Sequence, residues 1–376
     1  MADENYWLEY SNLQKVKHDL IKNYLQGWFP KMSLGPTGSS RLLYVDTHAG
    51  RGRHMSGKLG SPLVALESLL THTSRDKMLE GTEVRYYFIE RNTDNFNALQ
   101  GELKPVRLPS KVHASPLTGD FEQLFDKLLD DIDKNGSRLA PSFIFIDPFG
   151  FKLPGRILKR LLDFPKVELF INVIWRELDM AIRGAKKGTA KGMDKTLDMI
   201  FLGDSWREIE GDDADARAAQ CAAIYPKITG ARWGTHIRML DKNRIRYFLI
   251  HLSNHDAGRD LMKNCIWNSC PDGGYYASKA DNPDQQILIE PEPNLEPLRE
   301  WIFEKLADRP RRWLSLLDDL REELWLQKHF NEQIRELRKL KRLDGDRASY
   351  SGPFAMKNNP LLRLTSRFQG RGLPPG

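Results

Sequence analysis

The stretch Leu42-Leu-Tyr-Val-Asp-Thr-His-Ala-Gly-Arg-Gly52 decides the fold. Its four leading residues predict a buried β-strand, and the residues after them predict a loop that begins with an acid and contains glycines. Glycines at such a place let the backbone pass close to a ligand, because no side chain stands in the way. An isolated Gly-x-Gly is a weak signal, since an ordinary strand-to-helix turn has the same composition. The surrounding sequence therefore has to decide between these two interpretations.

Strands and helices alternate on both sides of this stretch. Near-continuous apolar strands separated by helices indicate a parallel sheet covered on both faces. Two later apolar runs flank Asp241-Lys-Asn-Arg244 and predict an antiparallel hairpin. Five parallel strands closed by a hairpin are typical of the doubly wound, Rossmann-like α/β sheet of class I methyltransferases. We predict strands at 42–45, 84–89, 112–114, 142–146, 168–174, 235–240 and 245–252, and helices at 13–29, 62–70, 92–103 and 122–132.

Acids stand at the ends of the first three predicted strands. Asp46 follows the first strand, Glu90 ends the second and Asp120 follows the third. Ligand hydroxyls sit at the position of Glu90 in doubly wound sheets, and Asp120 could accept a hydrogen bond from an adenine amine. A nicotinamide dehydrogenase would carry a third glycine three residues after Gly52 and an acid about 20 residues on; here no glycine stands at that position, and Glu90 lies far beyond that distance. The pattern therefore favours S-adenosylmethionine as the cofactor.

The fourth strand ends in Asp147-Pro-Phe-Gly150, which resembles the Asp/Asn-Pro-Pro-aromatic motif of amino-group methyltransferases. An exocyclic amine is a poor nucleophile, because its lone pair is delocalised into the ring. The Asp147 carboxylate and the Pro148 carbonyl could both accept from the NH2 group and aim its lone pair at a methyl group. Here Phe149 replaces the second proline and Gly150 the aromatic residue, so Phe149 and Phe151 are the two candidates for stacking on the base. The alternative is a tight turn with a capping aspartate.

Length and charge predict two domains and an anionic partner. The chain has 376 residues and a net charge of +6, of which residues 294–376 supply +5 through 17 Lys/Arg and 12 Asp/Glu. A polar, proline-rich linker at 280–293 separates a methyltransferase-like domain at 1–279 from a helical one at 294–367, and 368–376 reads as a disordered tail. Acidic residues and no apolar run near the N-terminus predict a cytoplasmic protein. The three cysteines have neither disulfide nor metal-ligand spacing, so we expect no metal.

Two basic segments are candidates for holding a nucleic acid. The run 183–195, in an expected insertion near 176–234, is glycine-rich and not periodic, and it offers Lys186, Lys187 and Lys191 to a phosphate backbone. The alternative for this run is a mobile, solvated loop. The C-terminal domain has the pattern of a winged helix, with helices at 295–307, 314–320 and 328–343 and a hairpin turn at 344–346. Its third helix carries basic residues that suit a groove or an RNA backbone, or else form a solvated face: Arg335, Arg338, Lys339 and Arg342.

Taken together, these segments resemble the three-Cys-motif partner protein family, named for cysteines on a genomic partner, a predicted radical enzyme. Several also resemble the J-type adenine-N6 methyltransferase of large-subunit ribosomal RNA. That family has Asp-Pro-Pro-Tyr where this chain has Asp147-Pro-Phe-Gly150. The segments that carry the resemblance are 17–18, 44–53, 60–66, 88–92, 119–121, 145–150 and 247–267.

The resemblance implies a cofactor pocket and a catalytic residue. It implies that Glu90 holds ribose hydroxyls, that Asp120 and Phe121 meet the adenine, and that Asp147 is catalytic. The residues expected to line the cofactor pocket are His18, Asp46, His48, Ala49, Gly50, Gly52, Ser61, Glu90, Arg91, Asp120 and Phe121.

We therefore expect an S-adenosylmethionine-dependent methyltransferase that acts on an exocyclic amine, adenine N6, of RNA or DNA. The alternative is a non-catalytic nucleic-acid-binding adaptor or specificity subunit for a partner protein that carries a three-Cys motif.

Overall fold

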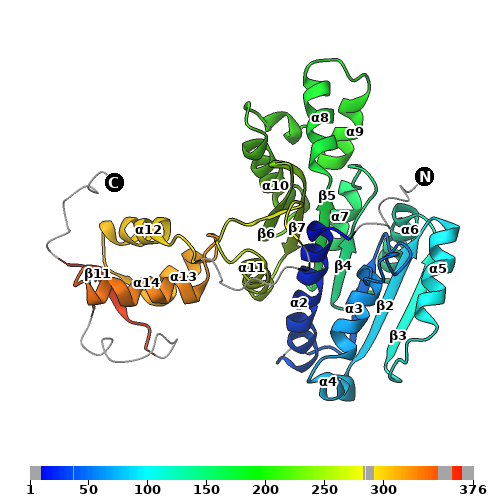
Figure 1. Ribbon diagram of the computed structural model, residues 1–376, viewed down its shortest axis with the longest axis horizontal. Coiled ribbons are helices and arrows are strands. Elements are labelled where there is room, and N and C mark those ends of the chain that lie inside the picture. Colours follow the sequence, from blue (N-terminus) through cyan, green and yellow to red (C-terminus); the bar gives the residue numbers. More distant parts are fainter. Residues whose placement is uncertain (1–9, 37, 283, 285–291, 346–357, 366–376) are drawn as a thin grey trace. The chain divides into compact units, whose positions relative to one another are not determined.

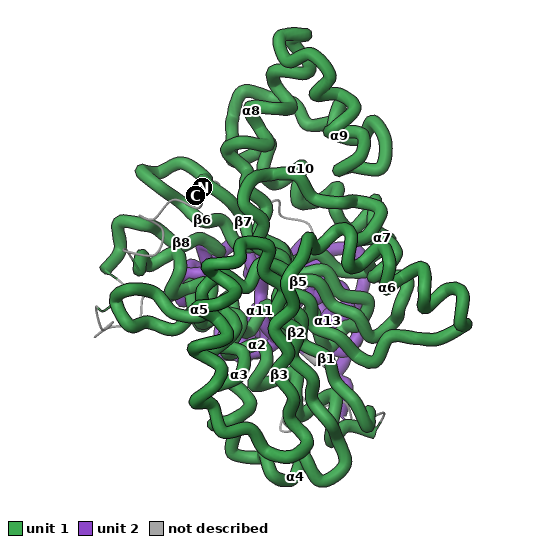
Figure 2. Tube along the Cα trace, turned by 90° about the vertical axis from the view of Figure 1, so that its right-hand side faces the viewer, with its two compact units in different colours: residues 1–270, 275–287 green, residues 271–274, 288–376 purple. Residues whose placement is uncertain are grey.

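The computed structural model describes residues 10–36, 38–282, 284, 292–345 and 358–365. The chain divides into two compact units, coloured separately in Figure 2: residues 1–270 with 275–287, and residues 271–274 with 288–376. The expected linker at 280–293 spans the boundary at 287/288. Most of that linker, and all of the expected tail at 368–376, lie outside the described residues.

An eight-stranded sheet with the order β3-β2-β1-β4-β5-β7-β6-β8 forms the centre of the first unit (Figure 1). β1 to β5 run parallel, and β7 lies antiparallel between β5 and β6. This order confirms the predicted class I methyltransferase architecture. The strands are β1 (Arg41–Asp46), β2 (Glu83–Glu90), β3 (Val112–Thr118), β4 (Ser142–Ile146), β5 (Val167–Val173), β6 (Trp233–Asp241), β7 (Arg244–Ser253) and β8 (Tyr276–Ser278), the last of which was not predicted.

Helices follow the strands as predicted, with small shifts at their ends. The segment 51–60 separates the end of β1 and its glycine loop from the next helix, α3, which begins at Ser61. The helices around the sheet are α2 (Asn12–Leu34), α3 (Ser61–Leu70), α4 (Arg75–Gly81), α5 (Thr93–Leu103), α6 (Phe121–Asn135), α7 (Gly155–Leu162), α10 (Ala214–Thr229) and α11 (Asp256–Ser269).

The two faces of the sheet carry different side chains, and β4 shows why. Residues alternate across a strand, so Phe143 and Phe145 face one side and Ile144 and Ile146 the other. On the first side, Phe143 packs against Tyr44, Phe170 and the α2 side chains Tyr24 and Trp28. On the second side, the two isoleucines belong to a larger, mainly aliphatic core shared with α6, α7 and α10. Aromatic packing therefore holds the N-terminal helix α2 against the sheet.

A buried polar group sits within the aromatic face. The Glu168 carboxylate on β5 accepts a hydrogen bond from the Tyr24 hydroxyl of α2 and pairs with His251 Nε2 of β7 at 2.9 Å. All three side chains are buried, and burial followed by the charge of Glu168 raises the pKa of Tyr24 well above its ordinary value. A buried carboxylate is tolerated only when such donors satisfy it. The group therefore fixes the position of α2 on β5 and β7.

The insertion after β5 is helical, which corrects the predicted non-periodic loop. α8 (Trp175–Lys186), α9 (Met193–Phe201) and a 3-10 turn (η1, Ser205–Glu208) precede α10. Arg183 and Lys186 are helical, and the loop is reduced to residues 187–192. The prediction missed α8 because glycines at 184 and 188 obscured the apolar spacing of Leu178 and Ile182, which are buried in the aliphatic core.

The second unit contains three helices and a three-stranded antiparallel sheet of order β10-β11-β9. The expected third helix was too long: α14 ends at Lys339, because Lys341 adopts a left-handed φ of 54° and stops the helix. Asp344 and Gly345 are strand residues, so the turn predicted there is wrong; residues 346–357 lie outside the described residues. The elements are α12 (Glu296–Ala307), β9 (Arg311–Arg312), α13 (Trp313–Leu320), α14 (Gln327–Lys339), β10 (Leu343–Gly345) and β11 (Leu361–Leu364).

Across the parts of the chain that the structure describes, no helix is both long and apolar enough to cross a membrane.

We predict that Tyr24→Phe lowers the free energy of unfolding by about 1–3 kcal/mol, because it removes one of the two side-chain donors to a buried carboxylate. Urea unfolding followed by circular dichroism measures this change. Thr73→Val, in an exposed turn, is the control and should change stability by less than ~0.5 kcal/mol. Equal urea midpoints for the two variants would show that Glu168 does not depend on the Tyr24 hydroxyl.

Candidate active site at the carboxyl ends of the strands

The strand order brings the predicted acids to one edge of the sheet. Asp46 ends β1, which pairs with β2 and with β4, and Asp46 lies opposite Phe88 and Phe145 in the two registers. Glu90 therefore ends the strand on one side of Asp46, and Asp147 follows the strand on the other side. Ligands of open α/β sheets bind at this edge.

Glu90 holds the glycine loop through its carboxylate. Its Oε2 accepts from the Gly50 amide at 2.8 Å, and its Oε1 accepts from the Asn92 amide at 2.6 Å. Each carboxylate oxygen can accept a second hydrogen bond, so the buried side chain retains capacity for ligand hydroxyls. The Ala49 amide donates to the Ile89 carbonyl at 2.8 Å, which pins the loop to β2 a second time.

Gly52 needs to be a glycine for two reasons. Its φ of 83° lies in the left-handed region, and a Cβ there would come within 3.0 Å of Leu99. The loop then closes on itself, since the Gly60 amide donates to the Gly52 carbonyl at 2.8 Å. Gly60 immediately precedes Ser61, the first residue of α3. The closed loop therefore places the N-terminus of α3 at the site.

Asp46 is fully buried and incompletely satisfied. Its Oδ1 accepts from the His48 amide at 3.2 Å, and its Oδ2 has no hydrogen-bond donor among the described residues. Burial raises the pKa of Asp46 to about 7, against the opposing effect of the nearby Ser61 hydroxyl and the His48 amide. A carboxyl group with an unused oxygen and a pKa near neutrality suits a cationic ligand, because the positive charge would stabilise its ionised form.

Three imidazoles surround the same region. Burial lowers the pKa of His18 well below its ordinary value, and burial lowers the pKa of His48 and of His54 to about 4. All three are therefore neutral at pH 7. The His18 and His54 rings lie 6.1 Å apart, and His18 Nδ1 is hydrogen-bonded to the Tyr10 hydroxyl at 3.1 Å. Nδ1 of His18 is used by Tyr10, and Nδ1 of His48 by the Thr47 hydroxyl at 2.8 Å, so each of these rings offers its Nε2 to a ligand.

The residues after β3 serve local structure as well. Asp120 caps α6 by accepting from the Glu122 and Gln123 amides, and Arg91 lies 3.8 Å from its carboxylate. Phe121 is buried and meets the His48 ring edge-on at 5.9 Å. These contacts place Asp120 and Phe121 beside the glycine loop. Asp120 is thus the N-cap of α6, and its carboxylate keeps further lone pairs for a ligand.

Asp147 is held by two partners that come from distant parts of the chain. Lys17 Nζ of α2 lies 2.5 Å from Asp147 Oδ2, and Asn172 Nδ2 of β5 donates to Asp147 Oδ1 at 2.6 Å. Burial raises the pKa of Asp147, but the Lys17 ammonium and the Asn172 amide outweigh it and hold that pKa below its ordinary value. Asp147 is thus an ionised carboxylate of fixed orientation, with a second acceptor position on each oxygen.

The rest of the Asp147-Pro-Phe-Gly150 loop faces outward. Phe149 is 64% exposed, whereas Pro148 is half-buried. Gly150 has a φ of 104°, and a Cβ there would lie 3.8 Å from Glu177 Oε2 of α8. The left-handed backbone explains why a glycine stands where the motif has an aromatic residue. It also leaves Phe149 as the exposed aromatic side chain of this loop.

Lys17 and Asn172 were missed as site residues, although each leaves a signal in the sequence. Lys17 stands four residues from Leu13 and from Ile21, on the face of α2 that is otherwise apolar. Asn172 interrupts a strand whose neighbours are apolar, on the same face as Phe170. A polar residue in a buried position needs a partner. The sequence did not show that the two partners would be the same carboxylate.

The basic candidates are distributed between both units. Lys186 Nζ donates to the Arg207 and Ile209 carbonyls at 2.6 and 2.8 Å, so its charge is used within the insertion. Lys187 and Lys191 are exposed beyond it. In the second unit, α14 and the residues after it carry Arg335, Arg338, Lys339 and Arg342, of which Arg335 and Lys339 are exposed.

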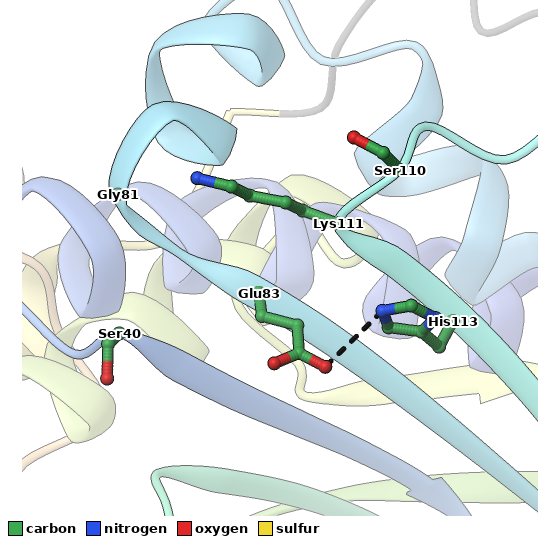
Figure 3. Close-up of a pocket in the computed structure, with 6 residues that line it drawn as sticks. All are labelled: Ser40, Gly81, Glu83, Ser110, Lys111 and His113. Carbon is green, nitrogen blue, oxygen red and sulfur yellow. Dashed lines mark ion pairs between the residues drawn. The ribbon is translucent and has the colours of Figure 1, made fainter.

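A surface depression of about 340 Å³ lies at the opposite edge of the sheet (Figure 3). Its lining comes from the amino ends of β1, β2 and β3, and it includes Glu83, which pairs with His113 Nε2 at 3.3 Å. The acids described above stand at the carboxyl ends of the same strands. This depression is therefore separate from the candidate active site.

No protein-family model and no curated protein matches the sequence. The comparison with solved structures gives matches of low identity and low TM-score, of which three follow. Protein LPL1258 from Legionella pneumophila is 14% identical over 63% of this chain and 85% of its own, with a TM-score of 0.32. The METTL16 MTase domain is 12% identical over 61% and 66%, with a TM-score of 0.30. A human methyltransferase 10 domain containing protein is 12% identical over 63% and 82%, with a TM-score of 0.30. The assignment to the class I methyltransferase architecture rests on the strand order.

We predict that Lys17→Met lowers the free energy of unfolding at pH 8 by about 3–5 kcal/mol, because it leaves the buried Asp147 carboxylate without its cation. The loss should shrink at pH 5, since the uncompensated carboxylate has a raised pKa and takes up a proton. In the unchanged protein the depressed pKa of Asp147 keeps the pair intact at both pH values.

Urea unfolding at the two pH values measures the effect. Lys15→Met is the control on the same helix, because Lys15 and its partner Asp19 are exposed, and it should cost less than ~1 kcal/mol. A Lys17→Met loss that is independent of pH would argue against the pair with Asp147.

Proposed function

We propose that this protein is an S-adenosylmethionine-dependent methyltransferase that acts on an exocyclic amine, adenine N6, of a nucleic acid. The observation that carries the proposal is the ionised Asp147 carboxylate, fixed by Lys17 and Asn172 beside the cofactor edge of a class I methyltransferase sheet. A carboxylate of fixed orientation at this place can accept a hydrogen bond from an NH2 group. It would repel a substrate group that can only accept hydrogen bonds.

The residues at the sheet edge fit the proposed cofactor. The unused Oδ2 of Asp46 supplies negative charge for a cationic ligand, and Glu90 supplies acceptors for ribose hydroxyls. His18, His48 and Ser61 would contact the amino-acid part, and Asp120 and Phe121 the adenine. Arg91, Ala49, Gly50 and Gly52 would form the wall of the pocket. When bound, S-adenosylmethionine supplies a methyl group activated by a positively charged sulfur.

The chain's own residues would orient the amine. One N–H of the amine donates to the free acceptor position of Asp147, and the Pro148 carbonyl accepts the other. Lys17 and Asn172 keep the carboxylate from turning, so the nitrogen lone pair is directed along one line. Phe149 is exposed and would stack on the base, which fixes the plane of the ring. Positioning of this kind requires no covalent intermediate.

A nucleic acid is supported by charge and by the second unit. We interpret the second unit as a winged-helix-like domain, because its three helices are followed by two antiparallel strands and it adds a short strand between the first two helices. Its basic third helix, α14, would contact the phosphate backbone. The resemblance to the three-Cys-motif partner family predicts, in addition, a protein partner that carries a three-Cys motif.

A second candidate function is a nucleic-acid-binding adaptor for a partner enzyme. Two observations favour it: both Asp147 oxygens already accept hydrogen bonds, and Gly150 stands in place of the aromatic residue of the motif. In such a protein the Lys17–Asp147 pair would be purely structural. The two candidates differ in whether bound S-adenosylmethionine donates its methyl group.

We predict that S-adenosylmethionine binds more tightly as the pH rises from 6 to 8. The pKa of Asp46 is about 7, so its carboxyl group gains the negative charge that attracts the cofactor over this range. If binding requires the ionised form, the affinity should rise roughly tenfold. Calorimetric titration at several pH values measures the change. Asp46→Asn keeps the shape of the side chain and should abolish this pH dependence of the affinity. An unaltered pH dependence in Asp46→Asn would contradict the assignment of Asp46.

We predict that Asp147→Ala reduces methyl transfer about 10²- to 10³-fold without weakening cofactor binding, since it removes the acceptor that orients the amine. The measurement is transfer of labelled methyl groups to RNA, DNA and protein pools, with mass spectrometry of the nucleosides for N6-methyladenosine. Asp131→Ala, on the exposed face of α6, is the control.

Because Asp147→Ala leaves Lys17 buried without an anion, Lys17→Met/Asp147→Ala is measured beside it and compared with Lys17→Met alone. Cofactor binding without transfer to any pool by the unchanged protein would support the adaptor instead.

A further inference from the structure

The insertion places a helix directly beside the candidate catalytic loop. α8 begins at Trp175, two residues after β5 ends, and its Glu177 lies next to Gly150 of the loop that carries Asp147 and Phe149. Figure 1 shows α8 and α9 projecting beyond the carboxyl ends of β4 and β5. A molecule that reaches Asp147 from this side must therefore pass along α8.

The exposed side of α8 carries a stripe of cations. Arg176, Met180, Arg183 and the C-cap residue Lys187, whose backbone is still helical, follow each other at intervals of four, three and four residues, and all four are exposed. At 100° per residue they fall within about 60° of arc, over a length of about 16 Å. The buried residues Leu178 and Ile182 lie on the opposite side of the helix, in the aliphatic core. The direction of the stripe is therefore fixed by the packing of α8.

The charges of the three cations of the stripe are not neutralised by acids of the described residues. Within the described parts of the chain, no acid forms an ion pair with Arg176, Arg183 or Lys187. Other arginines and lysines nearby are committed: Arg217 pairs with the buried Asp179 at 2.8 Å, and Lys186 donates to two backbone carbonyls. Lys186 is not part of the stripe, because it lies on a different side of the helix and points toward η1.

We propose that this stripe is the phosphate track that leads a single strand of nucleic acid to Phe149 and Asp147. The inference rests on the proposed function for its choice of a nucleic acid. Arg176, Arg183 and Lys187 bind successive phosphates, and Met180 lies between them as an apolar contact for sugar or base. Chemistry on a base requires that the base leave the stack, and a backbone held on α8 allows the target base to turn toward Phe149.

The test is the salt dependence of binding to a fluorescein-labelled 15-nucleotide single-stranded RNA, measured by anisotropy with the full chain. Each phosphate contact on a single strand contributes about −0.7 to the slope of log affinity against log salt concentration. Arg176→Gln/Arg183→Gln/Lys187→Gln should therefore reduce the magnitude of the slope by about 2. Arg183→Glu serves as a second, single-site variant and should weaken binding at low salt.

The matched control removes three charges at the opposite edge of the sheet, by Lys77→Gln/Lys104→Gln/Arg107→Gln, and should leave the slope unchanged. Equal slopes for the stripe variant and the unchanged protein, or equal losses in the stripe and control variants, would overturn the proposal. Calorimetric titration with S-adenosylmethionine is run in parallel on the stripe variant. That titration does not depend on the stripe, so loss of the track and failure of the proposed methyltransferase function give different results.

Discussion

The ion pair between Lys17 and Asp147 is the interaction on which the candidate site depends. It joins the first described helix to the end of the fourth strand, and both side chains are largely removed from solvent. A buried cation needs an anion close by, so neither residue can hold its place without the other. Because aromatic packing and the Tyr24–Glu168 contact fix α2 on the sheet, they also fix Lys17. The fold therefore positions the carboxylate from outside its own loop.

The sequence predicted most of the first unit, for a physical reason. Parallel strands place their carboxyl ends along one edge, so acids after successive strands had to meet there, as Asp46 and Glu90 do. The insertion was misjudged because glycines concealed the periodicity of α8, and α14 was drawn too long because a left-handed lysine ends it. The pair of Lys17 with Asp147 was beyond prediction, since 130 residues separate the partners and only the tertiary fold brings them together.

The departure from the Asp-Pro-Pro-aromatic motif has a local explanation. Gly150 adopts a left-handed φ that an aromatic residue would occupy only with strain, and its neighbour Glu177 belongs to the inserted helix α8. The aromatic side chain of this loop stands one position earlier than in the motif, at Phe149, which is largely exposed. The loop and the insertion are thus neighbours at Gly150 and Glu177. This proximity connects the altered motif to α8 and to the cations that α8 displays.

Two neighbouring carboxyl groups at this edge have opposite electrostatic environments, and this difference separates their roles. Burial without a full set of donors raises the pKa of Asp46, whereas Lys17 and Asn172 lower that of Asp147. Asp147 stays ionised whatever binds, which suits a fixed acceptor for an amine. Asp46 gains its charge most easily when a cation arrives, which suits a cofactor with a positive sulfur. If the two environments were exchanged, the acceptor would be lost to protonation near neutral pH and the cofactor site would hold a charge already neutralised by lysine.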